Sequence, residues 1–256
     1  MTSSPDTADS APGPAPDGPS PGRQVIPRPS QSYAGAPAPW ARLEPGLRRG
    51  LGLARVRAAV EAHHRGLVGQ DRVIFDGYPD PGSPAAVLVL LFGQGDETRV
   101  VLTRRAAHLR THTGEVSFPG GRLDGGETPE AGALRESSEE VGLDPATVEV
   151  VGRLTPLSTF SSTATITPVV GVLTGVPRLI ANPHEVERVF DVSLAELAAD
   201  GVFREERWIV PGRTLPVAES GEDGSFPIWF FELPHDTVWG ATARMLVELL
   251  RLVLAV

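Results

Sequence analysis

Three glutamates are crowded into one short helical pattern of the sequence. Glu136 and Glu140 are four residues apart, and Glu139 lies between them. At 3.6 residues per turn, Glu136 and Glu140 point the same way and Glu139 lies on the adjoining edge. Like charges at this spacing destabilise an exposed helix by roughly a few tenths of a kcal/mol. A solvated helix face would tolerate that repulsion, whereas a bound divalent cation would remove it.

The cations that suit such a cluster are Mg²⁺ and Mn²⁺. Both prefer oxygen ligands, and Mg²⁺ commonly binds few carboxylates and completes its shell with water and substrate phosphates. Two or three carboxylates on one rigid helix face supply oxygens at a fixed separation. Glu140 is expected to be a surface carboxylate in this arrangement. The pattern favours a site for Mg²⁺ or Mn²⁺.

The helix that carries these carboxylates has clear ends. Thr128 is a good N-cap, Pro129 fits the first helical position, and Gly142 is a natural C-terminal stop. The spacing of Leu134 and Val141 predicts which side is buried. That buried stripe contains Glu130, Leu134, Ser137 and Val141.

A pair of glycines, Gly120 and Gly121, precedes the helix. Glycine tolerates positive φ and lets backbone amide and carbonyl groups approach an ion or a phosphate closely. A Gly-Gly pair alone is a turn in most proteins. Next to a helix with this carboxylate spacing, it favours a ligand-binding loop.

The whole stretch resembles the Nudix box. Gly121 is followed after five residues by Glu127, and after seven more by Arg135–Leu143, "RESSEEVGL". Every charged and glycine position of the box is met over 23 residues. The one departure is Ser137 in an apolar position, where a small residue fits if its hydroxyl bonds back to the carbonyl of Ala133.

The segment before the box resembles the coenzyme A pyrophosphatase branch of the Nudix hydrolases. "LTRRAAHLRTHTGEVSFPGGRLD" (residues 102–124) matches the pattern Leu-Leu-Thr, any residue, Arg, Ser or Ala, three residues, Arg, three residues, Gly, three residues, Phe-Pro-Gly-Gly. Val101 replaces the first Leu. The likeness spans about residues 85–250.

The resemblance implies a fold, a reaction and roles for particular residues. The fold is an α/β (mixed α+β) Nudix fold, with a mixed β-sheet sandwiched between α-helices. The reaction is hydrolysis of a nucleoside diphosphate linked to another group; for CoA or acyl-CoA it releases 3′,5′-ADP and 4′-phosphopantetheine or its acyl form. Metal ligands are Glu136, Glu140, Glu139 and the carbonyl of Gly120. Catalytic roles fall to Glu139, Glu127 and Arg135, of which Glu127 and Arg135 orient the helix against its loop.

The resemblance does not single out one residue as the general base, and it leaves several candidates for the substrate contacts. The candidates for the base are, in order, Glu139, Glu185 and Glu187. Gly120 and Gly121 are expected to contact substrate, as are Arg104 and Arg110, which with Arg105 and His112 could receive the 3′-phosphate of CoA. Strand alternation would, on the alternative view, send one of Arg104 and Arg105 to bulk solvent. His112 is more simply explained as a structural hydrogen-bonding residue, and residues 229–231 ("WFF") as core rather than an adenine platform.

The expected elements alternate along the chain. Residues 53–64 and 239–254 read as helices, residues 85–92 and 98–105 as a hairpin, and residues 192–200 as a short helix capped at Ser193. Further strands are expected in these segments: "TVEVVGRL", "TPVVGVLTG", "EERWIVPG" and "SFPIWFFEL", the last two as a pair. This layout predicts one Nudix domain over residues 40–256.

The rest of the sequence narrows the class of protein. The first 39 residues hold ten of the chain's 25 prolines without apolar periodicity, which predicts a disordered tail over residues 1–39. The net charge of −9 argues against nucleic acid or a membrane surface as partner. There is no cysteine, which excludes thiolate chemistry. We expect a cytoplasmic protein whose partner is a small-molecule nucleotide of the CoA class, with a homodimer left open. ADP-ribose, a dinucleotide or an oxidised nucleotide is the alternative substrate, and a Nudix module that binds nucleotide without hydrolysis is the alternative class.

Overall fold

The computed structural model describes residue 24 and residues 26–67, 83–109, 114–158, 165–211 and 220–256. Its helices and 3₁₀ turns are η1 (Pro45–Arg48), α1 (Leu53–Leu67), α2 (Pro129–Val141), η2 (Pro145–Thr147), α3 (Leu194–Leu197) and α4 (Gly240–Leu254). Its strands are β1 (Gln31–Ala34), β2 (Pro84–Gln94), β3 (Glu97–Arg105), β4 (Val116–Ser117), β5 (Gly120–Arg122), β6 (Glu149–Arg153), β7 (Leu157–Ser158), β8 (Thr165–Leu173), β9 (Val186–Ser193), β10 (Phe203–Ile209), β11 (Phe226–Glu232) and β12 (Thr237–Trp239).

The main sheet is mixed and has β2 at its centre. Its path runs β4-β3-β2-β8-β6, with β9 on β3, β5 on β2 and β7 on β8. β2 and β3 form the predicted antiparallel hairpin, whereas β2 and β8 are parallel. A central strand covered on both faces reads as a continuous apolar run. Residues 85–92 show this, since all of them are buried.

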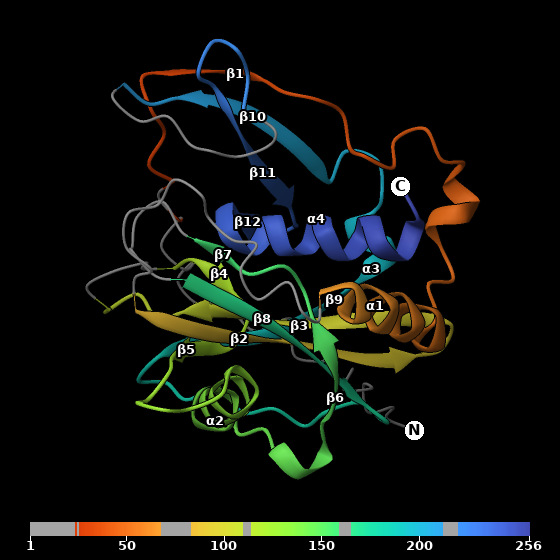
Figure 1. The fold of residues 1–256 in the computed structure, drawn as a ribbon, viewed down its shortest axis with the longest axis vertical. Helices are drawn as coiled ribbons and strands as arrows, with labels where there is room; N and C mark the ends of the chain where they lie inside the picture. The colour runs from red at the N-terminus through yellow and green to blue at the C-terminus, as the bar shows by residue number, and fades with distance from the viewer. Residues whose placement is uncertain (1–23, 25, 68–82, 110–113, 159–164, 212–219) are drawn as a thin grey trace, which may run out of the picture.

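Helices cover both faces of this sheet (Figure 1). Alternate side chains of β2 supply the two cores. Leu88 and Leu90 pack in the core that also holds Ala133 and Val141 of α2, whereas the core containing Val89 includes side chains of α1 and α4. The predicted fold class, a mixed sheet between helices, is therefore confirmed.

α4 lies between the main sheet and a second, smaller sheet (Figure 1). The second sheet has the order β1-β10-β11-β12, and β11 packs on α4. A helix between two layers has to be apolar on most of its circumference. Buried residues of α4 accordingly lie on several sides of it: Thr242, Ala243, Met245, Leu246, Val247, Leu249, Leu250, Val253 and Leu254.

Most expected elements are present close to their expected bounds. The late strand pair is β10 and β11, joined in antiparallel register from Phe203 opposite Phe231 to Trp208 opposite Phe226. Ser193 caps α3 through a complete capping box with Glu196. Residues 229–231 are buried, as expected for core side chains.

The N-terminal boundary differs from the prediction. Residues 31–34 lie within the segment expected to be disordered, yet they form β1 and pair with β10. The hydroxyl of Tyr33 also donates to Asp223, at 2.6 Å. The partners in these contacts, β10 and Asp223, are far away in the sequence, and the composition of residues 1–39 carries no information about them. Residues 1–23 and 25 lie outside the described part of the chain.

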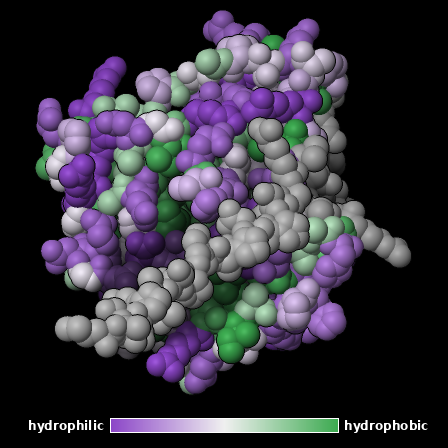
Figure 2. Space-filling view, turned by 180° about the vertical axis from the view of Figure 1, so that it is seen from behind, coloured by the Kyte–Doolittle hydropathy of each residue, from purple (hydrophilic) through white to green (hydrophobic). Residues whose placement is uncertain are grey.

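Hydrophilic side chains cover most of the rear face, with small apolar areas between them (Figure 2). Within the described residues, no helix combines the length and the apolar character that crossing a membrane requires.

Candidate active site

The helix that carries the acidic cluster, α2, is defined by its caps. The hydroxyl of Thr128 accepts a hydrogen bond from the amide of Ala131 at 3.3 Å. Gly142 ends the helix in the left-handed region, with φ 65°. The predicted ends of this helix are confirmed.

The buried side of α2 includes three small residues, Gly132, Ala133 and Ser137. Ser137 is fully buried, and its hydroxyl donates to the carbonyl of Ala133 at 2.7 Å, as expected for a serine in this apolar position. Small side chains allow the helix to approach β2 and β5 closely. As a result Glu140, one turn further along, is only 3% exposed. The expectation of a surface carboxylate at Glu140 is wrong.

The two glycines form a strand, β5, rather than the predicted loop. Gly120 pairs with Val87 of β2 at φ 152°, and a Cβ on Gly120 would lie 2.4 Å from the carbonyl oxygen of Ala86. A Cβ on Gly121 would lie 2.5 Å from the carboxyl carbon of Glu136. Side chains at these positions would displace either the strand or the carboxylate. The glycines therefore bring the backbone against the acidic face of α2.

Glu140 is a buried carboxylate with incomplete charge compensation. The amide of Gly120 donates to its Oε2 at 3.1 Å, and Nη1 of Arg105 lies 3.9 Å from its Oε1. Burial raises the pKa of Glu140 to about 7, against the lowering effects of the Gly120 amide and Arg105. The negative charges of Glu185 and Glu136 raise it further. A cation at this position would stabilise the ionised carboxylate.

Glu136 lies in a similar but more open environment. Burial raises the pKa of Glu136, and the ion pair with Arg135 opposes that rise. Nη1 of Arg135 lies 3.0 Å from its Oε1. Glu139, in contrast, has 57% of its side chain exposed and lies 3.5 Å from the same nitrogen. Glu136 and Glu140 thus face the glycine strand, whereas Glu139 lies on the open edge.

Arg135 ties the helix to the segment before it. Its Nε and Nη2 donate to the two carboxylate oxygens of Glu127, at 3.0 and 3.1 Å, and Nη2 also donates to the carbonyl of Arg122 at 3.1 Å. The hydrogen bonds that Arg135 donates to Glu127, followed by the one from the Asp124 amide, lower the pKa of Glu127. A bidentate pair fixes orientation as well as distance. Arg135 and Glu127 are therefore placed to hold Glu136 in position.

The neighbouring arginines of β3 point to opposite faces of the main sheet. Arg105 lies on the side of α2, near Glu140. Arg104 lies on the other side, is 4% exposed, and donates to Asp236 at 2.8 Å. The view that alternation sends one of the two to bulk solvent is wrong, because both faces of this sheet are covered. Arg104 therefore does not share a face with the carboxylate cluster.

Two candidates for the general base, Glu185 and Glu187, also lie on opposite faces of the main sheet. Glu185 lies near Glu136 and Glu140, close enough for its charge to affect both. Glu187 lies across the sheet, with its Oε2 3.3 Å from Nε of Arg104. A bulge where β9 pairs with Arg104 and Arg105 inserts this extra residue into the strand. Glu139 and Glu185 are on the side of the cluster, and Glu187 is not.

The comparisons with known proteins agree with this geometry. The model of the "NUDIX domain" matches residues 82–211. The chain is 35% identical over 178 residues to "Nudix hydrolase 3" of Caenorhabditis elegans, covering 68% of this chain and 74% of that protein. It is 36% identical over 166 residues to the "Uncharacterized Nudix hydrolase NudL" of Enterobacter sp. (strain 638), covering 64% and 80%. The chain belongs to the Nudix family.

The solved structures that resemble the chain are less similar. A Nudix hydrolase from M. Smegmatis, RenU, is 26% identical, with a TM-score of 0.40 over 45% of this chain and 73% of that one. A MutT/nudix family protein from Enterococcus faecalis is 19% identical, with a TM-score of 0.42 over 77% and 72%. The family assignment depends on the sequence matches and not on these structures.

Nudix hydrolases generally need a divalent ion such as Mg²⁺ or Mn²⁺. Across the described residues, no three acidic or histidine side chains converge closely enough to hold a metal by themselves. Two carboxylates, Glu136 and Glu140, do lie against the glycine strand with excess negative charge. Mg²⁺ needs only one or two carboxylates when water and substrate phosphates complete its shell. The donor set therefore fits a Nudix metal that is held jointly by protein and substrate.

Some predicted site residues lie outside the described part of the chain, and some structural residues were not predicted. Arg110 and His112 fall in the first group. Asn182 was missed: its amide donates to the carbonyl of Glu140 at 2.8 Å, and its side chain to that of Glu139 at 3.3 Å. Asn182 could not be found from local sequence patterns, because it lies 43 residues after Glu139. Arg105 had a signal, because the upstream pattern specifies an arginine at its position.

Proposed function

We propose that the chain hydrolyses the pyrophosphate bond of a nucleoside diphosphate derivative in a metal-dependent reaction, with CoA or acyl-CoA as substrate. The products are 3′,5′-ADP and 4′-phosphopantetheine or its acyl form. The observation that carries the proposal is the buried carboxylate of Glu140, held against Gly120 beside Glu136 in a chain of the Nudix family. Such a carboxylate is costly to bury without a cation.

The bound ions would neutralise phosphate oxygens, lower the pKa of a bound water and align nucleophile with leaving group. The remaining contributions come from the chain. Glu136 and Glu140, with the Gly120 carbonyl, are the proposed ligands, and Arg135 with Glu127 fixes the first of them. Arg105 is a cation on this face that can donate to a phosphate oxygen.

A carboxylate within reach of the attacking water would take its proton, which typically contributes about 10²–10⁴-fold. Glu139 is our first candidate, because it adjoins the ligands and is exposed to solvent. Glu185 is the second, since it lies beside the cluster from the turn before β9. Glu187 is the weakest of the three, because it pairs with Arg104 on the other face.

The choice of CoA depends on the pattern before the box. That pattern includes Arg105, which lies beside Glu140. The alternative substrates are ADP-ribose, a dinucleotide or an oxidised nucleotide, because the flanking segments decide specificity and a shared fold does not. A module that binds nucleotide without hydrolysis is a further alternative. It is disfavoured by the full set of glutamates, which binding alone does not require.

The test is an assay of the full chain with Mn²⁺ against CoA, ADP-ribose, NADH and 8-oxo-dGTP. We expect the highest kcat/KM for CoA or an acyl-CoA, and loss of turnover in Glu140→Gln. Turnover of ADP-ribose far above that of CoA would contradict the substrate assignment. Nucleotide binding without turnover of any of the four would favour the binding module.

A further inference from the structure

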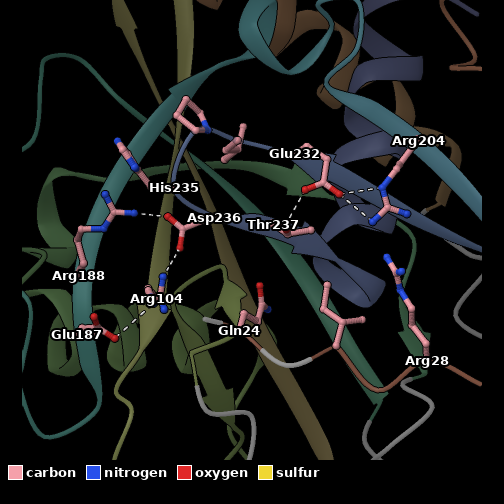
Figure 3. Close-up of a pocket in the computed structure, with 13 residues that line it drawn as sticks. Gln24, Arg28, Arg104, Glu187, Arg188, Arg204, Glu232, His235, Asp236 and Thr237 are labelled. Carbon is pink, nitrogen blue, oxygen red and sulfur yellow. Dashed lines mark hydrogen bonds and ion pairs between the residues drawn. The ribbon is translucent and has the colours of Figure 1, made fainter. Parts of the chain in front are cut away.

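A cavity of about 910 Å³ is lined by Arg104 (Figure 3), whose side chain lies on the other face of the main sheet from Arg105 and Glu140. It opens between β9, the turn joining β11 to β12, and the segment before β1. The side chains that matter for its chemistry are Arg28, Arg104, Glu187, Arg188, His235 and Asp236. Its volume is in the usual range for a small-molecule site.

The floor of the cavity is a buried ionic network. The carboxylate of Asp236 is 3% exposed and uses both oxygens, one for Nη1 of Arg104 at 2.8 Å and the other for Nη2 of Arg188. Arg104 is buried as well, and its Nε lies 3.3 Å from Oε2 of Glu187. A buried carboxylate shared by two arginines holds both guanidinium groups in place. The position of Arg188 is therefore fixed before any ligand arrives.

Most of the carboxylate oxygens that line the cavity already have a hydrogen-bond or ion-pair partner. Both oxygens of Asp236 are occupied, and so are both of Glu232, by Arg204 and by Thr237 at 2.7 Å. Arg188 uses Nη2 for Asp236 and keeps 43% of its side chain exposed, with its guanidinium 4.6 Å from the ring centroid of Phe190. Since a guanidinium has five N–H donors, an arginine in this position can still bind an anion.

Two further groups face the same space. His235 precedes Asp236 in the chain and lines the cavity together with Arg188 (Figure 3). Arg28 lines the opposite wall, with 51% of its side chain exposed and one nitrogen 2.9 Å from Glu206. The guanidinium groups of Arg188 and Arg28 thus approach the cavity from two sides.

We propose that this cavity binds a phosphomonoester, with Arg188 as its principal ligand and His235 and Arg28 as supporting contacts. The planar fork of arginine matches phosphate oxygens, and the volume leaves room for the organic part of the ligand. The phosphomonoester comes either from the substrate itself, remote from its diphosphate, or from a separate phosphorylated metabolite. The substrate source rests on the proposed function, whereas the existence of the site does not.

The test measures binding to the full chain by calorimetry without divalent metal, using 3′-AMP and, as its match lacking the phosphate, adenosine. We expect 3′-AMP to bind and adenosine to bind at least about tenfold more weakly, because charge-assisted hydrogen bonds are lost. Arg188→Gln should weaken 3′-AMP binding by about tenfold or more. Arg28→Gln should weaken it by a smaller factor. Arg57→Gln, which removes an arginine of α1 paired with Glu61 and Glu149, is the matched control and should bind normally.

Equal affinity for adenosine and 3′-AMP, or unchanged 3′-AMP affinity in both cavity variants, would overturn the proposal. No binding of 3′-AMP at millimolar concentration would overturn it as well. If Arg188→Gln does not fold, as judged by its melting curve, Arg28→Gln and the comparison with adenosine decide the matter.

The source of the ligand is decided by kinetics with CoA and dephospho-CoA. A substrate source predicts that Arg188→Gln raises KM for CoA alone and leaves kcat unchanged. A separate metabolite predicts the same loss of 3′-AMP binding with unchanged KM for both substrates. If neither substrate is hydrolysed, the proposed function fails, and the binding measurement still tests the site.

Discussion

Two consecutive arginines of β3 divide the molecule into two regions with different electrostatics. Arg104 lies in the region between the main sheet and the second sheet, where Asp236 and Glu187 compensate its charge. Arg105 lies in the region under α2, where Glu140 has two acidic neighbours and burial raises its pKa to about 7. The first region has matched charges in its floor. The second has excess negative charge.

The difference suggests a criterion: buried charges that are fully paired serve the structure, whereas a buried charge without a full partner marks a place for a ligand. Matched buried pairs hold side chains in place and depend on both partners. An unmatched carboxylate is costly in the folded protein, and it is retained where a ligand supplies the missing charge. On this basis we propose that the α2 side is the catalytic region and that the ionic network of the opposite cavity has a structural role.

The largest effect that we expect is on stability, from Arg104→Gln. This change leaves the buried carboxylate of Asp236 with Arg188 alone, and removing one partner of a buried pair costs about 3 kcal/mol or more. The measurement is the free energy of unfolding in urea. A loss of unfolding free energy well below 1 kcal/mol would mean that the Arg104–Asp236 pair contributes no more than a surface ion pair.

Arg105→Gln should lower activity and leave stability nearly unchanged, the reverse of what we expect for Arg104→Gln. Its guanidinium is 29% exposed and 3.9 Å from Glu140, so stability should change little. The kcat/KM for the best substrate should fall by roughly 10- to 100-fold, because a charge-assisted contact to the diphosphate is lost. Steady-state kinetics and a melting curve on the same preparation check this. Unchanged kinetics together with a large loss of stability would show that Arg105 is structural, like Arg104.

A smaller effect is expected from Arg135→Lys. Lysine keeps the charge but cannot make the two bonds to Glu127 and the one to the Arg122 carbonyl at once. Loss of a residue that orients a metal ligand typically costs about 10- to 100-fold, and we expect the lower end because the charge remains. The check is the activity as a function of Mn²⁺ concentration. A normal metal requirement and normal kcat would contradict the positioning role.

The smallest effect concerns the edge of the second sheet. Tyr33 donates to Asp223, and hydrogen bonds from Ser225 and then from Tyr33 lower the pKa of Asp223 to about 2. Because that pKa is depressed on folding, the contribution to stability is present above the unfolded value, 3.8, and is lost as the pH falls through about 2. Tyr33→Phe should therefore lower the melting temperature slightly at pH 7, and the difference should shrink between pH 4 and pH 2. A difference independent of pH would mean that the carboxylate is not involved.

Local signals were sufficient for the elements and for much of the site. The caps at Thr128 and Gly142, the bond from Ser137 to the Ala133 carbonyl, and the β2–β3 hairpin all depend on residues that are near one another in the sequence. Such features follow from propensity and spacing.

Features that depend on distant segments were not predictable in this way. The burial of Glu140 requires β5 to lie against α2, the pairing of Arg104 requires Asp236, and the order of residues 31–34 requires β10. Each is a tertiary contact that periodicity and composition do not specify. Strand alternation does predict that Arg104 and Arg105 point to opposite faces of the sheet. It does not predict which of the two faces α2 packs against.

The central claim is that a bound cation compensates the buried negative charge of Glu140. The direct measurement is Mn²⁺ binding to the full chain, followed by electron paramagnetic resonance with a non-hydrolysable diphosphate analogue present. We predict Mn²⁺ binding in the wild type and binding at least about tenfold weaker in Glu140→Gln, with both proteins folded. Equal Mn²⁺ affinity in the two proteins, or no Mn²⁺ bound to either, would contradict it.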